Sequence, residues 1–198
     1  LAFISLGLPD SLLGSAWPVM HKAFQVPLSY AGLVTMIISG GTICSSLMSE
    51  RLTKKFGTQI VTVFSVMLTA IALFGFSTAS AFWMLCLWAI PYGLGAGAID
   101  AALNNYVALH YNSRHMSWLH CFWGLGTIIS PYVMSYALTT SVWQNGYRMV
   151  SFIQIGITLI LFVTLPIWKV NKKETAQEEK AEEKVEVHKK PGMKAAIF

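Results

Sequence analysis

The sequence predicts an all-α membrane protein in which six transmembrane helices form two inverted repeats of three helices. The 198-residue chain is 55% hydrophobic and 12% charged, whereas a soluble domain carries about 25% charged residues. Its apolar residues fall into six runs, each close to the roughly 20 residues that a helix needs to cross a bilayer. Two of the runs also match two others in sequence, in the same order along the chain.

The six predicted spans are joined by short polar segments. They cover residues 1–21, 30–49, 59–79, 82–108, 118–139 and 147–168. The chain is already apolar at Leu1, with no basic segment or cleavage site in view, so we interpret its start as a truncated first span and not as a signal peptide. The six spans form one predicted transmembrane bundle, residues 1–168.

The repeat is visible at two places. GLPDSLL at residues 7–13 aligns with GAIDAAL at 97–103, and GTICS at 41–45 aligns with GTIIS at 126–130. Because each unit has an odd number of spans, the second triplet (82–168) enters the membrane from the side opposite to the first (1–79). Inverted repeats of this kind are typical of secondary transporters, whose substrate sites lie near the midplane at the repeat interface.

Lysine and arginine are distributed unequally between the two sides of the predicted bundle. The connections on one side carry seven of them, and those on the other side carry Lys22 and Arg148. The seven are Arg51, Lys54, Lys55, Arg114, Lys169, Lys172 and Lys173. The positive-inside rule then places the N-terminus and residues 169–198 in the cytoplasm of a multi-pass protein of the plasma or inner membrane. Residues 169–198 are predicted to be a charged linker that leads to a missing C-terminal half.

Several function classes have little support in the sequence. The chain has no basic stripe interleaved with aromatics, which argues against a nucleic-acid partner. No nucleophile triad or phosphate-binding loop is present, so we predict no enzyme activity and no cofactor. A metal site is not expected either, because the cysteines lack paired spacing and the clustered histidines lie five residues apart, about 140° on a helix. These residues are Cys44, Cys86, Cys121, His110, His115 and His120.

The stretch GAIDAALNNYVALH, residues 97–110, places polar groups inside an apolar run. Burying a central Asp in a membrane helix costs roughly 2.5–3.5 kcal/mol, and such residues are functional by default. We therefore predict that Asp100 couples protons to transport, and that Asp10, its partner in the repeat, does the same. The alternative is a structural carboxylate bonded across a helix interface.

Side chains that bond hydroxyl groups or stack on sugar rings are predicted to bind the solute. They are Asn104, Asn105, His120, Trp17, Trp123 and Gln154. Asn104 lies one turn from Asp100 on the same face, while Asn105 is turned about 100° away and suits a bond to a neighbouring helix better. For His120 and the two tryptophans, the alternative is placement at the membrane interface.

Three stretches carry a resemblance to a known family. They are Asp100-x-x-x-Asn104, the segment from Leu119 to Ile129, and Lys54-Lys55 before Gly57. On these, residues 1–168 resemble the N-terminal six helices of a major facilitator superfamily transporter, and within it the fucose permease-type branch of sugar:proton symporters. The resemblance implies twelve helices, a sugar-like solute, protons as the coupling ion, a lipid bilayer around the protein, and alternating access between two halves.

The sequence departs from the family pattern at two places. The loop pattern G-x-x-x-D-R-x-G-R-R has Lys54 where Asp is expected and Thr58 where Arg is expected. In the first span, the acidic residue of the branch would fall near Gly14, one turn after Asp10. Two alternative functions stay open: a drug or metabolite exporter of the same superfamily, and a non-transporting membrane receptor or scaffold.

Overall fold

The computed structural model describes residues 1–165, and this part of the chain consists of helices without any strand. The all-α prediction is confirmed for these residues, whereas the predicted linker, 169–198, lies outside them. The helices are α1 (Ala2–Asp10), α2 (Leu12–Ala23), α3 (Tyr30–Phe56), α4 (Thr58–Thr78), α5 (Phe82–His110), α6 (Ser113–Thr140) and a last helix, Trp143–Leu165.

Five of these helices are long and apolar enough to cross a membrane: α3, α4, α5, α6 and the last helix. They correspond to the predicted second to sixth spans. The helices run further than the apolar stretches do, so that α3 takes in most of the predicted loop 50–57 and α6 begins five residues before residue 118. An i,i+4 ion pair between Glu50 and Lys54 supports the polar extension of α3.

The predicted first span, 1–21, is not one helix but two short ones, α1 and α2. Pro9 lacks the N–H that would bond one turn back, and its ring clashes with the carbonyl there, which breaks a helix. The backbone N–H of Ser11 bonds instead to the carbonyl of Pro9. The break leaves Asp10 at the end of α1.

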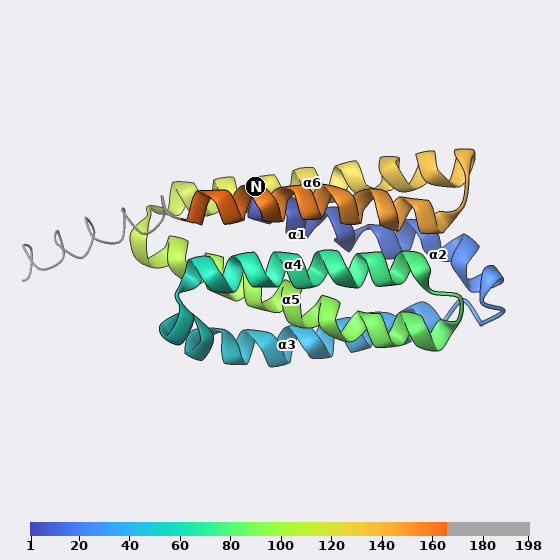
Figure 1. The fold of residues 1–198 in the computed structure, drawn as a ribbon, viewed down its shortest axis with the longest axis horizontal. Coiled ribbons are helices and arrows are strands. Elements are labelled where there is room, and N and C mark those ends of the chain that lie inside the picture. The colour runs from blue at the N-terminus through green and yellow to red at the C-terminus, as the bar shows by residue number, and fades with distance from the viewer. Residues whose placement is uncertain (166–198) are drawn as a thin grey trace, which may run out of the picture. The chain divides into compact units, whose positions relative to one another are not determined.

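The helices of the two repeat units pack crosswise. α1 packs mainly on α6, and α3 packs mainly on α5, as Figure 1 shows. In the sequence repeat, α1 corresponds to α5 and α3 corresponds to α6. The two pairings are therefore equivalent contacts, which is the relation expected between inverted repeats.

Glycines of the repeat allow this close approach. A Cβ atom on Gly7 would lie 2.1 Å from the carbonyl oxygen of Trp123, and one on Gly97 would lie 2.4 Å from that of Thr42. Hydroxyl groups then bond across the α3–α5 contact, where Ser45 Oγ donates to the Leu94 carbonyl at 2.5 Å. Small residues and interhelical hydroxyl bonds are the usual means by which membrane helices associate.

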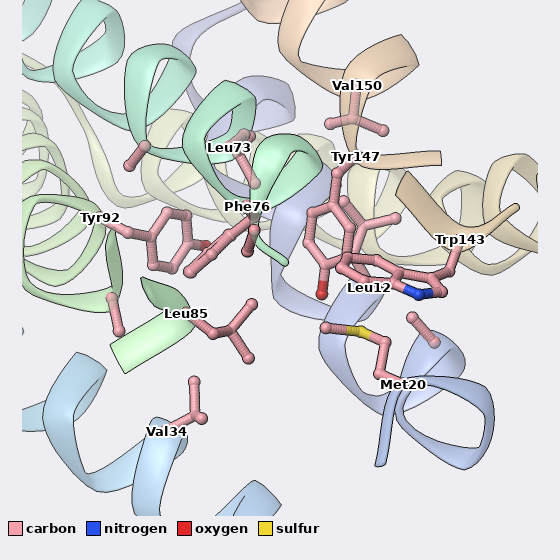
Figure 2. Packing of buried hydrophobic residues seen from close by; sticks show 14 of the residues in the cluster. Leu12, Met20, Val34, Leu73, Phe76, Leu85, Tyr92, Trp143, Tyr147 and Val150 are labelled. Carbon is pink, nitrogen blue, oxygen red and sulfur yellow. The ribbon is translucent and has the colours of Figure 1, made fainter. Parts of the chain in front are cut away.

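A hydrophobic cluster fills the bundle around the second half of α2. Figure 2 shows its members converging from several helices, with Leu12 and Met20 beside Tyr147 and Phe76 beside Tyr92. Phe76 and Tyr147 make an edge-to-face ring contact at 5.5 Å between centroids. This packing holds α2, α4, α5 and the last helix together on one side of Asp10.

Candidate functional site

A cavity of about 330 Å³ lies among α1, α3, α5 and α6 and contains both intramembrane aspartates. We call it the central cavity. Its lining residues are Phe3, Leu6, Asp10, Ile38, Thr42, Tyr92, Ala96, Asp100, His120 and Trp123. An apolar wall with a few convergent polar groups and a volume of roughly 300–1,000 Å³ is typical of small-molecule sites.

Asp10 is held by two aromatic donors from different helices. The hydroxyl of Tyr92 on α5 donates to Oδ1 at 3.1 Å, and Nε1 of Trp123 on α6 donates to Oδ2 at 2.9 Å. Each carboxylate oxygen thus accepts one hydrogen bond. Asp10, at the end of α1 in the first repeat unit, is therefore held by two helices of the second repeat unit.

Asp100 has a polar neighbour on its own helix. Nδ2 of Asn104 donates to Oδ1 of Asp100 at 3.0 Å, as the four-residue spacing predicts. The other amide atom of Asn104, Oδ1, is buried without a hydrogen-bond partner. Asn104 does not line the central cavity itself. It contacts the cavity only through the carboxylate of Asp100, to which it donates.

Neutral groups, not cations, compensate the two carboxylates. Across residues 1–165, the recorded salt bridge joins Lys54 and Glu50 at 2.6 Å on an exposed turn. Neither Asp10 nor Asp100 has an ion-pair partner in that part of the chain. In this part of the chain Asp10 is exposed and Asp100 is partly buried, and a carboxylate that lies within a membrane without a cation partner is costly to keep charged.

His120 and Trp123 form an aromatic edge of the central cavity. His120 lies on the ring of Phe3 in an edge-to-face contact with 5.9 Å between centroids. The Trp123 residue is 38% exposed, and its indole nitrogen is anchored on Asp10. A ring fixed at one edge and open elsewhere offers a platform on which an apolar sugar face can stack.

Two further predicted solute contacts, Trp17 and Gln154, also lie away from the central cavity. Trp17 is 4% exposed in the hydrophobic cluster and donates from Nε1 to the Leu28 carbonyl at 2.7 Å. Gln154 is fully buried; its side-chain oxygen accepts from Thr69 Oγ1 at 2.8 Å, and its nitrogen donates to the Ser5 carbonyl. Gln154 thereby ties α1, α4 and the last helix together.

Asn105 lies in a different groove. Together with Glu50, Lys54, Ser46 and other residues of α3, α4 and α5, it lines a cavity of about 510 Å³. The 100° turn between neighbouring helix positions separates it from Asn104.

Two polar residues of the central cavity, Tyr92 and Thr42, were not predicted from the sequence. Thr42 carried a signal that could have identified it, because it belongs to the repeated GTICS segment. Tyr92 stands beside the glycine-rich segment 93–97, which we interpreted only as a packing motif. The hydroxyl of Tyr92, directly before this glycine-rich segment, was the signal that could have marked it as a cavity residue.

Comparison with known proteins identifies the family. A model of the Major Facilitator Superfamily matches residues 1–197. "Bypass of stop codon protein 6" of Saccharomyces cerevisiae (strain ATCC 204508 / S288c) is 23% identical over 165 residues, 82% of this chain and 33% of that protein. "Glucose/mannose transporter GlcP" of Bacillus subtilis (strain 168) is 22% identical over 179 residues, 88% of this chain and 43% of that protein. The chain therefore spans less than half the length of these relatives, and it belongs to the major facilitator superfamily, a family of multi-pass membrane transporters.

Proposed function

We propose that the whole protein is a proton-coupled symporter of a small polar solute, most simply a sugar. The observation that carries this proposal is that Asp10 and Asp100, from equivalent positions of the sequence repeat, line one cavity together with His120 and Trp123. The name of the B. subtilis relative, a glucose/mannose transporter, supports a sugar. In this proposal the present chain supplies one wall of the site, and a second half supplies the other.

Proton binding in this proposal neutralises a carboxylate before the site changes the side to which it is open. An unpaired charge inside the membrane is costly, so a site that holds charged Asp10 or Asp100 resists occlusion. Binding of a proton removes that charge. A carboxylate or carboxyl group also bonds the hydroxyls of a sugar, so the proton and the solute act on the same side chains.

The proposal includes an orientation. The positive-inside rule favours a cytoplasmic N-terminus and a cytoplasmic segment after the last helix. The ends of the helices near Gly57 and Asn112 then face the cytoplasm, and those near Ser80 and Ser141 face outward. In the proposed cycle, alternating access comes from rocking of the two halves about the central cavity.

The test is uptake by the full-length protein in vesicles under an imposed pH gradient, with a panel of radiolabelled sugars that includes glucose and mannose. Asp100→Asn keeps the shape of the side chain but cannot exchange a proton. We expect this variant to lose accumulation above the equilibrium level, whereas Glu50→Gln, an exposed carboxylate outside the central cavity, retains it. Accumulation with unchanged pH dependence in Asp100→Asn would exclude proton coupling through this residue.

A further inference from the structure

Pro9 leaves one carbonyl of α1 without its usual helical partner. In an α-helix the N–H of each residue donates to the carbonyl four residues earlier, and proline has no N–H. The carbonyl that loses its donor is that of Ser5, which lies inside α1 and is 1% exposed. A buried carbonyl without a partner is costly, and the interior of a membrane offers no water to bond it. Ser5 therefore needs a donor from another helix.

Gln154 of the last helix supplies this donor. Its side-chain nitrogen donates to the Ser5 carbonyl, across 149 positions of the chain. Its side-chain oxygen accepts from Oγ1 of Thr69 on α4 at 2.8 Å. The partners fix this orientation of the amide, because a carbonyl oxygen can only accept and must face the NH2 group. A fully buried side chain thus closes the gap that Pro9 leaves in α1.

The other prolines inside the described helices have no such partner. Pro18, Pro91 and Pro131 lie inside α2, α5 and α6, and each removes the donor of the carbonyl four residues earlier. Among the side-chain hydrogen bonds within residues 1–165, one reaches a carbonyl freed in this way, and it is the bond that compensates Pro9. Pro9 is also the residue directly before Asp10. The compensated proline is therefore the one at the end of α1 that carries the carboxylate.

The bond to Ser5 bears directly on where Asp10 lies. α1 has only nine residues, and Asp10 is its last residue. With the Ser5 carbonyl bonded, α1 stays helical through Pro9 and ends where Tyr92 and Trp123 can both donate to the carboxylate. Without that bond, the carbonyl finds a partner only if α1 shifts or unwinds. Either movement displaces Asp10 from its two donors.

We propose that Gln154 is a positioning residue for Asp10, because its bond to the Ser5 carbonyl holds α1 where Asp10 reaches both donors. Gln154 does not line the central cavity, so it acts through α1 and touches neither the solute nor the proton. This inference rests on the proposed function, since it assigns Gln154 to the site of that symporter. It gives Gln154 a role other than the solute contact expected from the sequence.

A thermodynamic cycle between positions 9 and 154 tests the bond without any solute. Pro9→Ala gives the Ser5 carbonyl a helical N–H, so the donor from Gln154 is no longer needed. We expect Gln154→Leu to lower the thermal unfolding temperature of the full-length protein in detergent by several degrees. In the presence of Pro9→Ala the same change should lower it much less. Equal losses in the two backgrounds, including a failure to fold in both, would overturn the proposal.

Two further variants sharpen the cycle. Ser151→Ala is the matched control, because Ser151 is fully buried on the same helix and donates to the Ala70 carbonyl of α4 at 2.9 Å. Its loss should be the same with and without Pro9→Ala. Gln154→Glu is the conservative variant, because a protonated carboxyl group donates one hydrogen bond and accepts another. At acid pH it should be clearly more stable than Gln154→Leu, and equal stability of the two would contradict the role of the donor.

The pH profile of radiolabelled glucose uptake in vesicles separates positioning from stability. If Gln154→Leu moves Asp10 away from Tyr92 and Trp123, the charged carboxylate loses stabilisation and takes up a proton at higher pH. We expect the pH of half-maximal uptake to rise by about one unit or more, and to stay unchanged in Ser151→Ala. The other titratable groups on the central cavity are Tyr92, Asp100 and His120, and both variants retain them.

Two outcomes of the uptake assay have different meanings. A lower maximal rate in Gln154→Leu with an unchanged midpoint would show a structural role only and overturn the positioning of Asp10. Uptake that does not depend on pH in the wild-type protein would overturn the proposed symport. The thermal cycle alone then confirms or overturns the bond between Gln154 and α1.

Discussion

At the residue scale, the most informative feature is the pair of donors on Asp10. Two neutral N–H and O–H groups stabilise the charged carboxylate without a permanent cation. Hydrogen bonds to a charged group contribute roughly 1.5–3 kcal/mol each. Loss of either donor therefore removes part of the stabilisation of the charged carboxylate.

Trp123→Phe removes one of these donors and keeps an aromatic ring at the cavity edge. With less stabilisation of the charged form, protonation occurs at higher pH. We expect the pH of half-maximal uptake to rise by roughly one to two units, since 1.36 kcal/mol corresponds to one unit. The measurement is the pH profile of uptake, with Trp118→Phe, an exposed tryptophan on the same helix, as control. An unchanged or lowered midpoint would show that the indole N–H does not stabilise Asp10.

Four candidate residues predicted from the sequence lie on one cavity: Asp10, Asp100, His120 and Trp123. A charged residue in an apolar run is a strong signal of a functional site, because burying the charge in a membrane is costly whichever way the helix faces. Trp17 and Gln154 carried no comparable signal. Their helices are apolar on nearly all sides, so periodicity does not distinguish a side chain that faces a cavity from one that bonds a neighbouring helix.

At the element scale, the repeat predicts which helices touch. The glycines that align in the sequence, Gly7 and Gly97, both lie at close helix crossings. The break between α1 and α2 was harder to predict from the sequence. Membrane helices often tolerate proline when neighbouring groups bond the backbone carbonyls that it leaves unpaired. Pro9 therefore did not by itself predict that the first span would split at Asp10.

Gly7→Ala tests the close crossing of α1 and α6. The added methyl group would lie 2.1 Å from a backbone oxygen, so the helices must separate, at a cost of roughly 1–3 kcal/mol typical of overpacking. We expect a lower thermal unfolding temperature in detergent and a weaker solute affinity. Gly14→Ala, where nothing lies within 4 Å, is the matched control and should be neutral or stabilising. Equal stability of the two variants would mean that the crossing is looser than described.

At the scale of the whole molecule, the fold class was predictable because hydropathy and charge follow directly from the bilayer. The five long helices and the pairing of repeat units agree with it. The solute was not predictable, because this chain covers 43% or less of the relatives it matches. In the proposed symporter, side chains of the other half complete the recognition of the solute.

The most direct test of the proposed symport is the movement of protons with the sugar. Glucose is added to de-energised vesicles that contain the full-length protein in weakly buffered medium, and the external pH is recorded. Symport predicts a transient alkalinisation of the medium that is abolished by Asp10→Asn and by Asp100→Asn and retained in Glu50→Gln. Glucose entry without any change of external pH would contradict proton coupling at the central cavity.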